Sequence, residues 1–114
     1  MTYPYGKVQP QAIPLEQAVL GALMLDREAV LQVVDLLSPE SFYLDSHQLI
    51  YRAIVSLFNR SEPVDLLTVT EELRRSGDLE KVGNAYYLIE LSNQVASSAN
   101  IEYHSRIIQE KWMQ

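Results

Sequence analysis

Residues 14–26 read PLEQAVLGALMLD, and this stretch decides the fold. Pro14 suits the first position of a helix, and Glu16 lies near the positive end of the helix dipole, where an acidic side chain is stabilising. Over 15–25 nearly all other residues are apolar, which leaves the helix almost no polar face. Such a helix is normally buried at the centre of a domain. Gly21 costs about 1 kcal/mol relative to alanine, which predicts the close approach of another helix.

The remainder of the chain is also helical in pattern, and strict alternation of apolar and polar residues never persists long enough to predict a strand. Asp26, Asp45 and Asp65 are candidate N-caps, and Gly77 is a natural helix end. We therefore predict an all-α fold, a compact bundle of about six short helices. The expected helices cover about 15–25, 27–37, 46–60, 66–76, 85–94 and 99–114.

The last predicted helix carries an apolar stripe and no stop signal. The stripe consists of Ile101, His104, Ile108 and Trp112. Neither glycine nor proline follows it, and a large apolar residue two positions from a natural end would have little to pack on. We expect the chain to be a fragment of a longer protein, with a frayed natural end as the alternative. In a stripe cut short, Ile101, Ile108 and Trp112 should lack part of their cover. An exposed apolar stripe favours association with a partner, so all four residues are candidates for self-association.

Composition narrows the function classes. The chain has 114 residues, 47% of them hydrophobic, and its 9 basic and 15 acidic side chains give a formal net charge of −6. Disordered and low-complexity classes are excluded. Few, scattered cations disfavour a stand-alone nucleic-acid binder, so a protein is the expected partner. We also expect a soluble, intracellular domain, because the sequence contains neither a membrane-length apolar run nor a signal peptide.

The usual chemical motifs are missing from the sequence. Gly77 and Gly83 are six residues apart and Asn84 follows them, so no phosphate-binding loop is present. The chain has no cysteine, and its two histidines, His47 and His104, are far apart in sequence. We therefore predict no catalytic, cofactor-binding or metal site in this chain.

Tyr86 and Tyr87 are the candidate partner contacts. On the helix expected over 85–94, the core face is set by Leu88 and Leu91, and by Val95 just beyond it. Tyr86 falls on the polar face and Tyr87 at its edge, where aromatic side chains often anchor a partner. The alternative is that both are boundary residues that cover the rim of the core.

Several segments in order resemble the N-terminal domain of DnaB-type replicative DNA helicases. The first is 14–26, which resembles the opening motif of that family. The others are 36–43 (LLSPESFY), His47 with 50–51, 62–68 (EPVDLLT), Gly83 with 87–88 and Leu91, and 99–103 (ANIEY) with 106–107. Ser41 stands where the family usually has Asp, and Asn84 where a second glycine is common.

This resemblance implies a set of domains and partners. Residues 1–13 would be a flexible N-terminal arm, 14–95 the globular helical domain, and 96–114 the start of a dimerisation hairpin, cut before a linker and an absent ATPase domain. The parent would be a hexameric, ATP-dependent 5′→3′ DNA helicase of the bacterial cytosol, using ATP and Mg and contacting single-stranded DNA through the absent domain. This piece would pair subunits in the collar of the ring and bind primase and, in some systems, loader proteins.

Two rival classes remain open at this point, the first of them with a variant. An unrelated all-helical adaptor or dimerisation module would lack an ATPase domain downstream. The helicase-binding domain of primase is similar in fold, but the motif at 16–25 argues against it. A small helical enzyme would need a clustered polar pocket.

Overall fold

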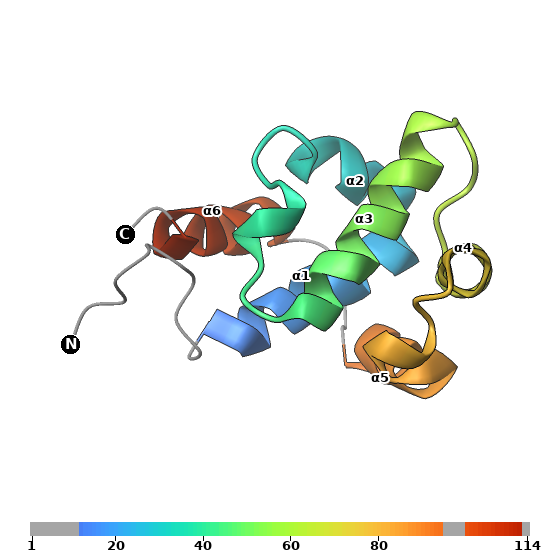
Figure 1. Cartoon of the computed structure of the whole chain (residues 1–114). Helices are drawn as coiled ribbons and strands as arrows, with labels where there is room; N and C mark the ends of the chain where they lie inside the picture. Colours follow the sequence, from blue (N-terminus) through green and yellow to red (C-terminus); the bar gives the residue numbers. More distant parts are fainter. Residues whose placement is uncertain (1–11, 95–99, 113–114) are drawn as a thin grey trace.

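A computed structural model describes residues 12–94 and 100–112 (Figure 1). Within these ranges there is no strand, which confirms the predicted all-α bundle. The α-helices are α1 (Ile13–Leu25), α2 (Arg27–Val33), α3 (Asp45–Asn59), α4 (Leu66–Ser76), α5 (Asn84–Asn93) and α6 (Ile101–Trp112). Two short 3-10 turns, η2 (Pro39–Ser41) and η3 (Glu80–Val82), precede α3 and α5. No helix in the described ranges is both long and apolar enough to span a membrane.

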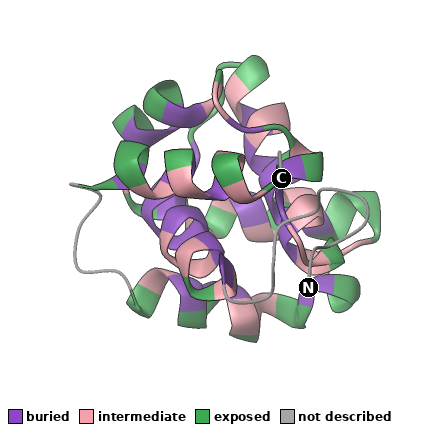
Figure 2. Cartoon of the chain, turned by 90° about the vertical axis from the view of Figure 1, so that its left-hand side faces the viewer, coloured by how far each residue is buried: buried purple, intermediate pink, exposed green. Residues whose placement is uncertain are grey.

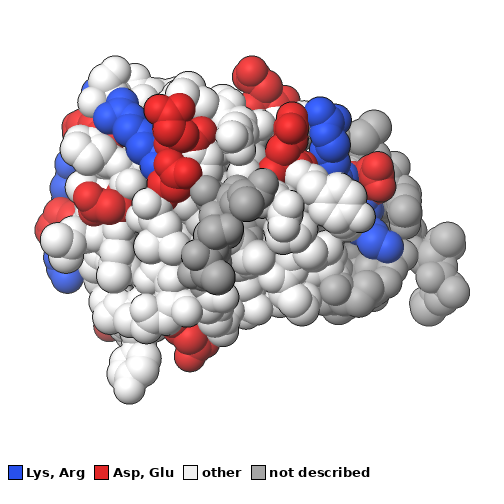
Figure 3. Space-filling view, turned by 180° about the vertical axis from the view of Figure 1, so that it is seen from behind, with Lys and Arg blue, Asp and Glu red and all other residues white. Residues whose placement is uncertain are grey.

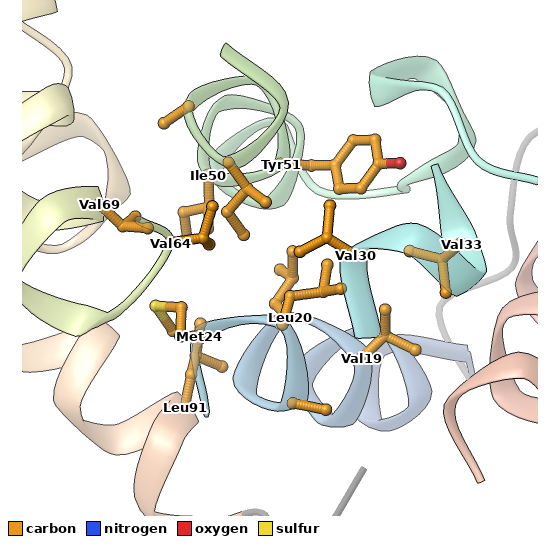
Figure 4. Packing of buried hydrophobic residues seen from close by; sticks show 14 of the residues in the cluster. Val19, Leu20, Met24, Val30, Val33, Ile50, Tyr51, Val64, Val69 and Leu91 are labelled. Atoms are coloured by element: carbon orange, nitrogen blue, oxygen red, sulfur yellow. The ribbon is translucent and has the colours of Figure 1, made fainter. Parts of the chain in front are cut away.

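Helix α1 forms the centre of the bundle and contacts each of the other five α-helices. In Figure 1, α1 and α3 lie in the middle, with α6 on one side and α4 and α5 on the other. Val19, Leu20 and Leu23 are fully buried, as expected for a helix without a polar face. Figure 4 shows Leu20 and Met24 among side chains from α2, α3 and the α4–α5 side. Exposed residues line the outward faces of the helices (Figure 2).

Local signals located three of the helix boundaries correctly. The Asp26 carboxylate accepts a hydrogen bond from the Glu28 N–H at 3.0 Å, at the start of α2. Asp65 and Thr68 form a reciprocal capping box, in which the Thr68 N–H donates to Asp65 Oδ1 at 2.8 Å. Helix α4 ends at Gly77, whose φ of 81° is left-handed. These predictions are confirmed because the signals act within one turn of the chain.

Two other boundaries differ from the prediction. Asp45 is not an N-cap: it is the first residue of α3, since the Gln48 N–H already donates to the Leu44 carbonyl. Helix α2 ends at Val33, and the chain then turns instead of remaining helical to 37. The predicted arm over 1–13 lies largely outside the described residues, but Ala12 is buried and Ile13 begins α1.

Helix α6 is covered more fully than its sequence suggested. Ile101 and Ile108 are buried in the same cluster as α1, because α6 packs against α1 and α2. The expectation that these two residues lack cover is therefore wrong. His104 is half-buried, whereas Trp112 keeps 37% of its surface exposed. The all-round apolar surface of α1 needs cover on this side, and α6 supplies it.

Candidate partner-binding surface

The surface of α5 contains the most exposed aromatic residue of the described ranges. Tyr86 is 83% exposed, and Ile89, one turn along the same helix, is 45% exposed. Leu88 and Leu91 face the opposite way and are fully buried, as predicted. Val95, which the pattern also placed on the core face, lies outside the described residues.

Tyr86 and Tyr87 both line an open hollow of about 530 Å³. It is formed by the start of α3, by η3 and by the first turns of α5. Its lining residues are Leu44, Ser46, Lys81, Val82, Gly83, Tyr86, Tyr87 and Glu90. We call this hollow, together with the exposed face of Tyr86 and Ile89, the α5 surface.

Tyr87 plays a different part from its neighbour. Its ring is half-buried, packs against the core and stacks on His47 with ring centroids 5.9 Å apart. Its hydroxyl lies 2.6 Å from His47 Nε2 and accepts a hydrogen bond from Gln17 Nε2 at 3.3 Å. This geometry favours the core-rim alternative for Tyr87 and leaves Tyr86 as the exposed candidate contact.

A buried carboxylate supports this arrangement. Glu16 and His47 are both fully buried, and Glu16 Oε1 lies 2.7 Å from His47 Nδ1. The other oxygen, Oε2, accepts the Tyr43 N–H at 2.8 Å. Because an ionised carboxylate only accepts, His47 Nδ1 is the donor to Glu16. A neutral imidazole with its proton on Nδ1 would then accept the Tyr87 hydroxyl proton at Nε2. We call this set, Gln17–Tyr87–His47–Glu16, the buried chain.

Sequence reasoning placed Glu16 in a favourable first turn but did not predict its burial. Its partner His47 is 31 residues away and lies on α3. One signal was present: a carboxylate in a helix that is otherwise apolar must find a partner, because an unpaired buried charge is strongly unfavourable. Nothing in the local sequence identified which residue the partner would be.

The order Tyr–His–Glu matches that of a nucleophile, a base and the acid that orients the base. A role for Tyr87 as a nucleophile does not follow from this order. Burial raises the pKa of the Tyr87 phenol, and the nearby charges of Glu90 and Glu16 act in the same direction, although the hydrogen bond from Gln17 opposes them. The phenol therefore stays protonated at neutral pH and serves as a hydrogen-bond donor.

The absence of a side chain at Gly83 leaves room for the side chain of Tyr87. Its φ is +100°, and a Cβ atom at Gly83 would lie 3.0 Å from Tyr87 Cβ. Any L side chain here would be strained by the backbone and would press on Tyr87.

We expect Gly83→Ala to lower the free energy of unfolding by about 2 kcal/mol, from left-handed strain plus this contact. Gly77→Ala is the matched control. Gly77 has a φ of +81° but nothing within 4 Å of its added Cβ, so only the strain of about 1 kcal/mol applies. Urea unfolding of both variants measures the difference, and equal losses would contradict the contact.

Acidic and basic side chains are interspersed on the surface of the described residues: they lie side by side on the face seen in Figure 3, next to a broad uncharged area. Six basic side chains of the described ranges pair with carboxylates: Arg52, Arg60, Arg74, Arg75, Lys81 and Arg106. The bond from Arg60 holds the pKa of Glu72 below its ordinary value.

The fold and the α5 surface thus define an all-α domain with an exposed aromatic side chain beside an open hollow. A profile of the family described as "DnaB-like helicase N terminal domain" matches residues 8–110. The chain belongs to this family, which confirms the resemblance found in the sequence.

Similar proteins agree with this assignment. The chain is 58% identical over 106 residues to the replicative DNA helicase DnaB of Rhodothermus marinus, covering 93% of this chain and 11% of that protein. It is 48% identical over 105 residues to DnaB of Geobacillus stearothermophilus, covering 92% of this chain and 23% of that protein. The chain thus spans less than a quarter of the length of these relatives.

Solved structures show the same fold. The crystal structure of the N-terminal domain of DnaB helicase from Mycobacterium tuberculosis aligns with a TM-score of 0.86 at 40% identity, covering 93% of this chain and 72% of that one. A structure described as a DnaB-like replicative helicase and its interactions with primase aligns with a TM-score of 0.74 at 30% identity, covering 86% of this chain and 22% of that one. The chain corresponds to the N-terminal domain of a replicative helicase.

Proposed function

We propose that this chain is the assembly and protein-docking domain of a hexameric replicative DNA helicase, and that it binds primase through the α5 surface. The exposure of Tyr86, at 83% beside an open hollow, is the observation that carries the proposal. Large exposed aromatics anchor many protein interfaces. The described interaction of a similar helicase with primase supports primase as the partner.

The motor activity would belong to a part of the parent outside this chain. There, ATP and Mg would drive 5′→3′ unwinding of duplex DNA and single-stranded DNA would be contacted. Loader proteins are a second expected class of partner. The family match removes the support for an unrelated adaptor or for the helicase-binding domain of primase.

Tyr86→Ala should weaken primase binding by about thirtyfold, or roughly 2 kcal/mol, without lowering the melting temperature. The second expectation follows because the side chain is almost fully exposed and contributes little to the core. The matched control is Tyr103→Ala, an aromatic on α6 that is 66% exposed. Calorimetric titration with primase compares the two, and unchanged affinity for Tyr86→Ala would contradict docking at α5.

Self-association is the other proposed role, through the hairpin that α6 would begin. Of the four candidates, Trp112 is the apolar residue left exposed, and it borders a hollow with Leu36, Leu37 and Gln109. Since Ile101 and Ile108 are already buried, little apolar area remains for a partner. We infer weak, concentration-dependent dimerisation of this chain, which would tighten when the whole hairpin is present.

Trp112→Ala should reduce that dimerisation more than Tyr103→Ala does, because Trp112 continues the apolar stripe of α6. Sedimentation equilibrium over a range of concentrations measures both variants. A longer chain with the complete hairpin that remains monomeric at high concentration would exclude this interface.

A further inference from the structure

The buried chain connects three helices through hydrogen bonds. Gln17 of α1 donates to the Tyr87 hydroxyl of α5 at 3.3 Å, and this hydroxyl lies 2.6 Å from His47 Nε2 of α3, which accepts its proton when the imidazole is neutral. His47 Nδ1–H then donates to Glu16 of α1 at 2.7 Å. Each group has a partner, so the set forms a polar network that runs from the fully buried Glu16 and His47 to the half-buried Tyr87 and Gln17. Networks of this kind specify one arrangement of the elements that they join.

Helix α5 depends on such a link for its orientation. It has only ten residues, and positive φ values occur at its N-cap, Gly83 (100°), and at its first residue, Asn84 (64°). Leu88 and Leu91 hold it by apolar contact, which is not directional. The Tyr87 hydroxyl adds directional contacts, and therefore fixes the rotation of α5 about its own axis.

That rotation decides where the next residue points. Tyr86 precedes Tyr87 on the same helix, and both line the same hollow. If Tyr87 is held, Tyr86 and the hollow have one geometry before any partner arrives. A preformed surface loses less conformational freedom on binding.

We propose that Glu16 and His47 are positioning residues for the α5 surface: they orient Tyr87 and thereby hold α5 in the geometry that a partner meets. The predicted effect of this positioning on partner binding rests on the proposed docking function. The positioning itself is a property of the free chain and is measured without a partner.

Two nearly isosteric variants test the role of the buried chain. Tyr87→Phe keeps the ring that stacks on His47 and removes only the hydroxyl. Glu16→Gln keeps the shape but places an amide donor where a carboxylate oxygen accepts. The control is Tyr51→Phe, which removes another hydroxyl from the interior. That hydroxyl donates to the Leu37 carbonyl at 2.9 Å and does not touch α5.

Amide hydrogen exchange of the free 114-residue chain is the first measurement. The amides of α5 should exchange about tenfold faster in Tyr87→Phe and in Glu16→Gln relative to the rest of the protein, and should not do so in Tyr51→Phe. Unchanged exchange of α5 in both variants, with only a general loss of stability as in the control, would overturn the proposal.

The nitrogen-15 spectrum of the His47 imidazole is the second measurement. We expect the proton on Nδ1 in the unmodified chain, and a proton on Nε2 would overturn the direction of the chain. Primase titration completes the test: Tyr87→Phe should weaken binding severalfold through loss of preorganisation. If Tyr86→Ala weakens primase binding and Tyr87→Phe does not, positioning fails. If Tyr86→Ala has no effect while α5 loosens as expected, the docking function fails and positioning stands.

Discussion

His47→Ala is expected to lower the free energy of unfolding by about 3–5 kcal/mol, a large fraction of the roughly 5–15 kcal/mol that stabilises a domain. The substitution leaves Glu16 fully buried with one remaining partner, the Tyr43 N–H. It also removes the acceptor of the Tyr87 hydroxyl and opens a cavity. Each of these effects destabilises the folded state in the same direction.

Urea unfolding followed by circular dichroism measures this loss. The control is His104→Ala, a half-buried histidine on α6, for which a loss of about 1 kcal/mol or less is expected. If His47→Ala costs no more than His104→Ala, the buried chain does not stabilise the fold.

Alkaline solution should destabilise the domain through Tyr51, by about 3 kcal/mol between pH 10 and pH 12. Burial, and to a lesser extent the charge of Asp35, raises the pKa of Tyr51 to about 12. An unfolded tyrosine loses its proton near pH 10. The stabilising contribution of the folded-state proton is therefore complete below pH 10 and is lost as the pH rises toward 12.

Tyr51→Phe isolates this effect. It should cost about 1 kcal/mol at neutral pH, because the hydrogen bond to the Leu37 carbonyl is lost. It should also flatten the decline of stability above pH 10, leaving only the contributions of other groups such as Tyr87. A variant that declines as steeply as the unmodified chain would show that Tyr51 is not the group responsible.

The parts of the fold that were predictable from the sequence depend on neighbouring residues. The absence of a polar face on 15–25 predicted the central helix, and the Asp65 cap and Gly77 predicted both ends of α4. The Asp45 cap failed by one residue, because hydrogen bonding of α3 begins at Leu44. Caps are short-range signals, so an error in assigning one displaces the helix boundary only slightly along the sequence.

The candidate site was predictable only in its exposed half. Helical periodicity placed Tyr86 on the polar face of its helix, and there it is found. The buried half joins residues that are distant in sequence: Glu16 and His47 are 31 positions apart, and His47 and Tyr87 are 40 positions apart. For α6, an apolar stripe showed that Ile101 and Ile108 need cover, but it did not show whether α1 or another subunit supplies it.

The central claim, that this chain is a docking domain that uses its α5 surface, is tested most directly by an amide-resolved NMR titration. Isotope-labelled chain would be titrated with primase to saturation. The largest changes in amide chemical shift are expected in α5 and around the hollow lined by Ser46, Lys81 and Tyr86, with α6 little affected. Shifts confined to α6, or no shifts at saturating primase, would contradict it.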